Sequence, residues 1–162
     1  LHHLEADVVR RAQSFRREIS VVREGVAAAE LGATAMHDAT ECGVLGGLHE
    51  LAQAAGLGLR VEKERIVVEP AVLEICECFG IDPYAAISEG TLIIACREHA
   101  AETIVGALSR KGIASSVVGE LTAPGEEMVI VDGGKEKKLE HPVVDPFWRA
   151  FAEACKRSAG SD

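Results

Sequence analysis

Two short stretches of the sequence combine residue types that could bind or process an anionic ligand. The first is HDATECGVLGG at residues 37–47, in which Asp38 and Thr40 precede three glycines, Gly43, Gly46 and Gly47. Asp38 or Thr40 could cap a helix that begins here, and the N–H groups of a first helical turn attract anions. Neither the Walker motif nor the dinucleotide-binding motif is present. The pattern therefore leaves open a phosphate or carboxylate cradle and, equally, close packing of a helix on a sheet.

The second stretch is SEG at residues 88–90, directly before the apolar run TLIIAC. A carboxylate beside a glycine at the mouth of a buried strand is well placed to face a cleft. Glu89 could act there as a general acid or base, or bind a cation, although a single glutamate can also be simply exposed. Ser88 has no histidine or lysine at a spacing that would activate it as a nucleophile. We expect Ser88 and Gly90 to contribute to substrate or phosphate binding.

The six histidines and five cysteines of the chain do not have the spacing of a metal site. His37 and Asp38 are neighbours on a predicted strand, so their side chains face opposite sides of it. The cysteines show no zinc-type CxxC spacing, and an odd number cannot all form disulfides. We expect no metal site and reduced, buried thiols, as in a cytoplasmic protein.

Charge and hydropathy argue against two classes of partner. The formal net charge of −9 disfavours a general nucleic-acid-binding protein, which needs a basic face to displace counterions. No apolar run approaches the roughly 20 residues of a membrane-spanning helix. We therefore expect no nucleic-acid partner, no membrane association and a cytoplasmic location.

Hydrophobic periodicity predicts the elements that must position these residues. A long helix is expected over residues 5–31 with Gly32 as its stop, followed by a strand over residues 33–38 and a helix over residues 42–55. Further strands are expected at residues 59–63 and 91–96, and further helices at residues 70–79 and 98–112. Pro70 favours a helix start because proline suits the first helical position.

The last third of the chain is predicted to close the fold. Strands over residues 114–121 and 127–134 would form a tight hairpin around Pro124 and Gly125, and KEKKLEH at residues 135–141 would be polar and mobile. A final helix would begin at Pro146 with Asp145 as its N-cap. The expected fold class is α/β (α+β), with one mixed sheet and helices mainly on one side of it.

Residues 20–122 resemble the C-terminal domain of the AIR-synthase (PurM-like) superfamily, and most of all its HypE and AIR-synthase-related branch. The resemblance depends on several motifs taken jointly, each of which alone is weak. They are Met36, Asp38, Thr40 and Gly43, LHELA at 48–52, GLG at 56–58, CECFGIDP at 76–83, SEG at 88–90 and GEL at 119–121.

The resemblance implies a PurM C-terminal-domain-like fold, in which a mixed sheet is layered with helices and partly resembles a ferredoxin-like sheet. Residues 1–32 would be a linker helix and residues 33–162 the domain. An ATP-binding N-terminal domain, absent from this chain, would precede them, form a homodimer, and hold most of the ATP and Mg. A hydrogenase-maturation partner is also implied, while no cofactor is expected for this chain alone.

The chemistry that the resemblance implies is ATP-dependent phosphorylation of an amide or carbonyl oxygen, followed by displacement or elimination. In the HypE branch this reaction dehydrates a carboxamide in hydrogenase maturation. By position Glu89 would take part in that chemistry, while Asp38, Thr40 and the three glycines would face the cleft between the two domains. The isolated chain is expected to have no ATP turnover.

Several positions depart from the HypE pattern. Ala39, Glu41 and Cys42 stand where that branch typically has proline, arginine and glycine, and Ser88 replaces asparagine. Glutamate in place of arginine removes a phosphate partner and adds negative charge. That branch ends in a cysteine, whereas this sequence ends in CKRSAGSD and Cys155 lies inside a predicted helix, so we do not expect Cys155 to carry the substrate. Two alternatives stay open: a related enzyme with another phosphorylated substrate, and a non-catalytic interaction domain.

Overall fold

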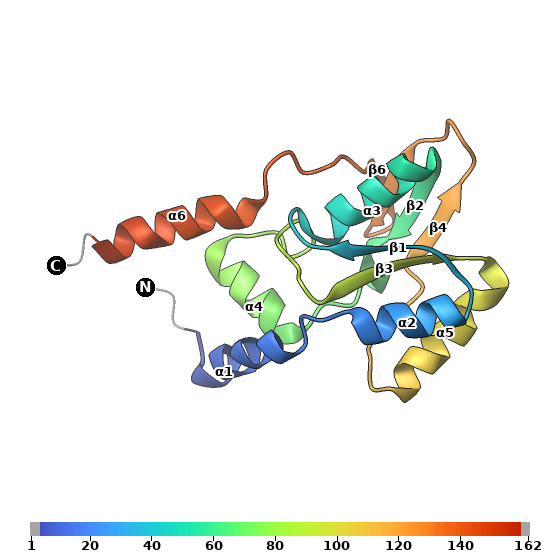
Figure 1. Cartoon of the computed structure of the whole chain (residues 1–162). Helices are drawn as coiled ribbons and strands as arrows, with labels where there is room; N and C mark the ends of the chain where they lie inside the picture. The colour runs from blue at the N-terminus through green and yellow to red at the C-terminus, as the bar shows by residue number, and fades with distance from the viewer. Residues whose placement is uncertain (1–3, 160–162) are drawn as a thin grey trace.

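The computed structural model describes residues 4–159, which form two separate β-sheets and the helices around them (Figure 1). The smaller sheet pairs β1 (Ala33–Ala39) antiparallel with β3 (Thr91–Cys96). The larger sheet has four strands in the order β4-β2-β5-β6. The predicted fold class is confirmed, but the expectation of a single sheet is wrong.

The larger sheet is mixed. Its strand β2 (Gly58–Glu62) pairs antiparallel with β4 (Gly119–Thr122) and parallel with β5 (Met128–Asp132). The predicted hairpin between β4 and β5 is therefore wrong, because β2 lies between them. The loop predicted as mobile instead contains β6 (Lys135–Lys138), which pairs antiparallel with β5. Gly133 and Gly134 have φ of 58° and 74°, as a two-residue hairpin turn requires, so this Gly-Gly pair was a usable signal.

Helix α3 (Gly43–Ala55) lies between the two sheets. Val44, Leu48 and Ala52 are buried against the larger sheet, together with Leu59, Val61, Ile130 and Leu139. Gly47 faces the smaller sheet on the other side. The helix begins and ends within one residue of its predicted bounds, and Gly56 closes it in the left-handed conformation.

The other face of the smaller sheet is covered by α2 (Val22–Glu30) and α5 (Glu98–Arg110). A second core cluster forms here from Ala27, Ala28, Ala100, Ile104 and Leu108, with Ile94 of β3 packed against it. The layers thus run from α2 and α5, through β1–β3 and α3, to the four-stranded sheet.

The single helix predicted over residues 5–31 is wrong, because the chain forms α1 (Ala6–Ser14), a 3₁₀ turn η1 (Phe15–Arg17) and then α2. The break lies where residues 18 and 19 pass over Gly90. A Cβ on Gly90 would lie 2.9 Å from the carbonyl oxygen of Glu18, closer than real side chains approach. Apolar spacing continues through both helices, so periodicity alone could not reveal this break.

The remaining helices are α4 (Pro70–Phe79), the 3₁₀ turn η2 (Lys63–Arg65) and α6 (Pro146–Ala159). Helix α4 lies beside α1, and Arg11 Nη2 of α1 lies 3.2 Å from Glu69 Oε2. The predicted N-cap of α6 is confirmed, since the N–H of Phe147 donates to Asp145 Oδ1 at 2.8 Å. Helix α6 projects from the body (Figure 1). Between residues 4 and 159 no helix is both long and apolar enough to cross a membrane.

Replacing Leu48 with alanine should test the role of α3 as the layer that both sheets share. Leu48 is buried in the main core cluster, so Leu48→Ala should lower the free energy of unfolding by about 2–5 kcal/mol. Leu73 also lies on a helix but is exposed, and Leu73→Ala should cost less than about 1 kcal/mol. Urea denaturation measures both values; equal losses would contradict this packing.

Candidate functional site

The pairing of β1 with β3 brings the two predicted stretches together. Ala39 lies opposite Thr91, so the end of β1 meets the start of β3. The N–H of Ser88 donates to the carbonyl oxygen of Thr40, and Ser88 Oγ donates to that of Ala39, both at 3.1 Å. The carbonyl oxygen of Thr40 also accepts the N–H of Gly43 at 3.1 Å. Backbone hydrogen bonds therefore tie the glycine-rich turn to the SEG segment.

Each of the three glycines lies where a Cβ would come too close to another residue. A Cβ on Gly43, whose φ is 63°, would lie 2.6 Å from the carbonyl oxygens of Tyr84 and Ala86. A Cβ on Gly46 would lie 2.7 Å from the Cβ of Cys42, and one on Gly47 would lie 2.8 Å from Cδ1 of Ile93. These distances support the packing interpretation of the glycine pattern.

The start of α3 is capped by a residue far away in the sequence. The sequence suggested Asp38 or Thr40 as its N-cap, but neither residue caps it. The N-cap is Cys42, in the left-handed conformation with φ 62°. The N–H of Cys42 donates to Oδ2 of Asp145 at 2.7 Å, and Asp145 is only 3% exposed. The positive end of the helix dipole stabilises a carboxylate in this position. The anion in the turn is thus supplied by the chain itself.

Cys42 is buried beneath the segment that carries Asp145. Its Sγ donates to the carbonyl oxygen of Pro142 at 3.1 Å. Burial raises the pKa of the Cys42 thiol, and the negative charges of Asp145, Glu41 and Glu50 raise it further. The thiol is therefore protonated at neutral pH and is a poor nucleophile.

Two histidines hold the carboxylate of Glu50 on the outer side of α3. His37 Nε2 of β1 lies 2.7 Å from Glu50 Oε2, and His141 Nε2 lies 3.1 Å from Glu50 Oε1. The hydrogen bond from His37 is the main cause of the lowered pKa of Glu50. The hydrogen bond from His141 lowers this pKa further, whereas burial of the carboxylate raises it. Sequence reasoning missed this group because its members come from β1, α3 and the segment before α6. Over residues 4–159, no group of three or more His, Cys, Asp or Glu residues is arranged to hold a metal ion.

The other predicted site residues lie at the surface. Asp38 pairs with Leu92, so it shares the sheet face on which α2 packs and not the face on which α3 packs. Asp38, Thr40 and Glu89 are exposed and Ser88 is half-buried. They lie close together at the end of β1 and the start of β3. These residues form the exposed rim of the glycine-rich turn, whereas the glycines and Asp145 lie in its buried interior.

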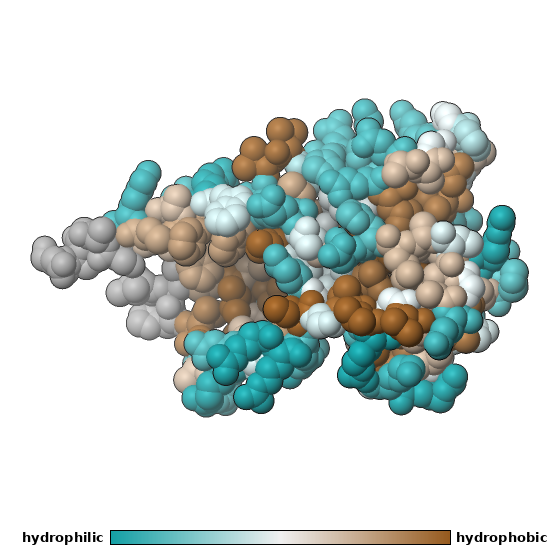
Figure 2. All heavy atoms as spheres, in the orientation of Figure 1, coloured by the Kyte–Doolittle hydropathy of each residue, from teal (hydrophilic) through white to brown (hydrophobic). Residues whose placement is uncertain are grey.

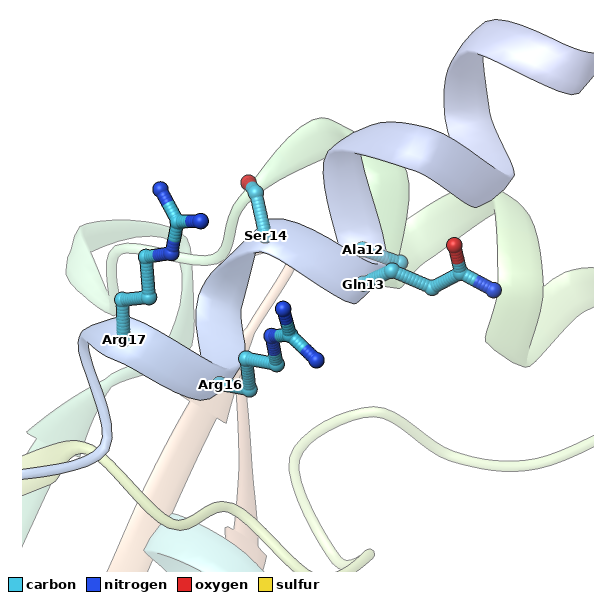
Figure 3. A pocket seen from close by; sticks show the side chains of 5 residues that line it. All are labelled: Ala12, Gln13, Ser14, Arg16 and Arg17. Carbon is cyan, nitrogen blue, oxygen red and sulfur yellow. The ribbon is translucent and has the colours of Figure 1, made fainter.

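A separate hollow of about 700 Å³ lies beside α1 and η1 (Figure 3). It is open and is lined by Ala12, Gln13, Ser14, Arg16 and Arg17. The two arginine side chains stand beside it in Figure 3. It includes none of the residues predicted for the site.

Comparison with protein families gives one match over most of the chain. Residues 3–132 match the model described as AIR synthase related protein, C-terminal domain. Among curated proteins, carbamoyl dehydratase HypE of Escherichia coli K12 is 32% identical over 120 residues, which cover 73% of this chain and 36% of that protein. HypE of Rhodobacter capsulatus is 35% identical over 100 residues, covering 60% and 29%. The chain thus spans about a third of the length of these relatives.

The solved structures that superpose on this chain include structures of HypE, the protein to which these curated relatives also belong. The crystal structure of E. coli HypE, a hydrogenase maturation protein, superposes with a TM-score of 0.69 at 29% identity and covers 80% of this chain and 42% of that one. A HypE structure in complex with ATP has a TM-score of 0.64 and covers 71% and 37%. A HypE–HypF complex has a TM-score of 0.58 and covers 72% and 39%. The last two are 23% identical and support the fold alone.

A pair of glycine substitutions should measure the close approach at the start of α3. Gly43 and Gly80 share a φ of 63°, but only Gly43 has backbone atoms where a Cβ would lie. Gly80→Ala should cost about 1–2 kcal/mol for the left-handed conformation alone. Gly43→Ala should cost about 1–3 kcal/mol more, because the 84–86 segment must move. Chemical denaturation measures both; equal losses would rule out the contact.

The dependence of stability on pH should reveal the histidine pair at Glu50. Because the pKa of Glu50 is lowered in the folded state, its stabilising effect is complete above its ordinary pKa, near 4.5, and is lost as the pH falls through the lower value. Glu50→Gln should therefore lose less stability than the unaltered chain on acidification through this range. The difference should be below about 1 kcal/mol, since Glu50 is partly solvated. Thermal melts from about pH 6 to pH 3 test this, and parallel curves would contradict it.

Proposed function

This chain belongs to the family of AIR synthase related proteins and spans their C-terminal domain, and we propose that it forms one wall of the nucleotide–substrate cleft of a HypE-like, ATP-dependent enzyme. The relatives named carbamoyl dehydratase suggest dehydration of a carboxamide in hydrogenase maturation as the reaction. In this proposal a further domain, equivalent to the rest of those relatives, binds most of the nucleotide and Mg.

The observation that carries the proposal is the joining of the two stretches at one end of the smaller sheet. The Ser88 hydrogen bonds to Ala39 and Thr40 put Glu89 beside the glycine-rich turn. Glu89 is exposed there, and its carboxylate is free to reach a substrate bound against this surface as a general acid or base. Asp38 and Thr40, also exposed, would hydrogen-bond the substrate or its phosphate.

Gly43, Gly46, Gly47, Ser88 and Gly90 have a supporting part in this proposal. Their close backbone contacts fix the shape of the turn, so that the exposed side chains keep their positions. A rigid support of this kind limits the entropy lost when a substrate is bound and oriented.

An apolar surface on α2 supports contact with a further domain. Ile19, Val22, Val26 and Met36 are exposed, and Figure 2 shows brown surface above α2. Exposed apolar groups that lie together indicate an interaction surface. In the proposal this surface adjoins the nucleotide-binding domain, residues 1–32 serve as the linker to it, and residues 33–162 are the domain proper. That other domain would form the homodimer, and a hydrogenase-maturation protein such as HypF is a candidate partner.

A related enzyme with a different substrate is the second candidate, and Glu41 favours it. The carboxylate of Glu41 accepts a hydrogen bond from Trp148 Nε1 at 3.1 Å. Glu41 therefore contacts its own chain, whereas the arginine typical of the HypE branch at this position could bind a phosphate. A non-catalytic interaction domain is the third, since Asp145 already fills the start of α3.

Substitution of Glu89 in the full-length protein tests the catalytic assignment. Glu89→Gln removes the titratable group but keeps its shape, so ATP-dependent turnover should fall at least about a hundredfold, while Tm stays nearly unchanged because the side chain is exposed. Glu127 is exposed as well, in the turn before β5, and Glu127→Gln should leave turnover unchanged. Normal turnover in the Glu89 variant would refute its catalytic role.

A further inference from the structure

The segment after β6, together with the first residues of α6, crosses the glycine-rich turn and is attached there by a few polar contacts. We call residues 140–148 the strap. It starts from Leu139, which is buried in the core and whose N–H donates to the carbonyl oxygen of Met128 at 2.8 Å. His141 then contacts Glu50, the carbonyl oxygen of Pro142 accepts from Cys42, and Trp148 donates to Glu41.

Asp145 is the central contact of the strap. Its Oδ2 accepts the N–H of Cys42 at 2.7 Å, and its Oδ1 accepts the N–H of Phe147 at 2.8 Å. One carboxylate therefore caps two helices, α3 and α6. A charged group at the start of a helix is held by backbone donors and by the helix dipole. It occupies the position that the sequence suggested for an external phosphate or carboxylate.

Between Pro142 and Asp145 the strap has no buried apolar side chain. Val143 is 94% exposed and Val144 is 70% exposed, although they lie next to the buried Asp145. A segment with few buried apolar contacts opens locally at a lower free energy than the whole domain. The strap has this character, while Leu139 fixes its beginning to the core.

We infer that the strap is a latch that inhibits its own domain: it closes the glycine-rich turn by seating Asp145 at the start of α3. Release of Asp145 uncovers Cys42 and frees its N–H for an anionic group of the substrate, while the N–H groups of Gly43 and Leu45 stay bonded to the carbonyl oxygens of Thr40 and Tyr84. The identity of this group as substrate rests on the proposed function, but the latch itself does not. The inference concerns only the strap, α3 and the turn between them.

Alkylation of cysteines in the native chain, followed by peptide mapping, tests the latch. Cys42 and Cys76 are both buried, each 8% exposed, but only Cys42 lies under the strap. Asp145→Ala should raise the iodoacetamide reaction rate of Cys42 at least about tenfold and leave that of Cys76 unchanged, because opening is local. Equal acceleration at both cysteines would mean global unfolding and would overturn the latch.

Asp145→Asn separates opening of the strap from a change in thiol reactivity. Asparagine removes the negative charge beside Cys42, as alanine does, but keeps the shape and one carbonyl acceptor. Cys42 should therefore react several-fold faster in the Ala variant than in the Asn variant; equal rates would mean an electrostatic effect alone and would overturn the inference. Val143→Ala, within the strap but without a buried contact, should leave both cysteines at their original rates.

The two proposals fail separately. Alkylation of Cys42 in this chain needs neither ATP nor the rest of the protein, so a negative result there refutes the latch and leaves the role of Glu89 intact. In the full-length protein, release of an inhibitory strap predicts that Asp145→Ala raises ATP-dependent turnover, and unchanged turnover would overturn self-inhibition. Loss of turnover in a folded Asp145→Ala protein would show that Asp145 supports activity and would overturn self-inhibition.

Discussion

The backbone of α3 lies closer to its neighbours than a side chain would allow, and the position of the candidate site depends on this approach. Gly47 brings the helix against Ile93 of the smaller sheet, and Gly43 brings its first turn against the carbonyl oxygens of residues 84 and 86. The opposite face of the helix packs on the larger sheet. One helix therefore fixes the distance between two sheets that share no strand, and the ends of β1 and β3 take their places relative to it.

Burial of a charge at the start of α3 follows from this geometry. The first N–H groups of a helix need acceptors, and the close packing leaves little room for water at Cys42. Asp145 supplies an acceptor, and the cost of removing its carboxylate from water is offset by two backbone hydrogen bonds and the helix dipole. The interior of the turn is thus occupied, and the groups able to act on a ligand lie at its rim.

The crossing of the chain over Gly90 links the rim to the N-terminal helices. Because Gly90 has no side chain, residues 18 and 19 can pass directly beside the segment that carries Glu89. The same crossing ends the first helix and turns the apolar side of α2 partly outward. The SEG segment, the break between the helices and the apolar surface of α2 are therefore parts of one arrangement.

The sequence alone determined the features that depend on local chemistry. Pro70 predicted the start of α4, and Gly56 predicted the end of α3. Hydrophobic patterns predicted β1, β3 and β5. Asp145 and Pro146 predicted the N-cap and first residue of α6. The motifs at residues 36–58 and 76–90 also indicated the family. These signals are readable because each involves residues close along the chain.

Tertiary structure alone decided which distant segments meet. Insertion of β2 between β4 and β5, separation of the sheets, capping of α3 by Asp145 and the grouping of His37, Glu50 and His141 all join residues far apart in sequence. Hydrophobic periodicity records which face of an element is buried, but not which partner buries it. The glycine-rich stretch was therefore recognisable as a place of close approach, whereas the carboxylate that fills it could be found only once the chain had folded.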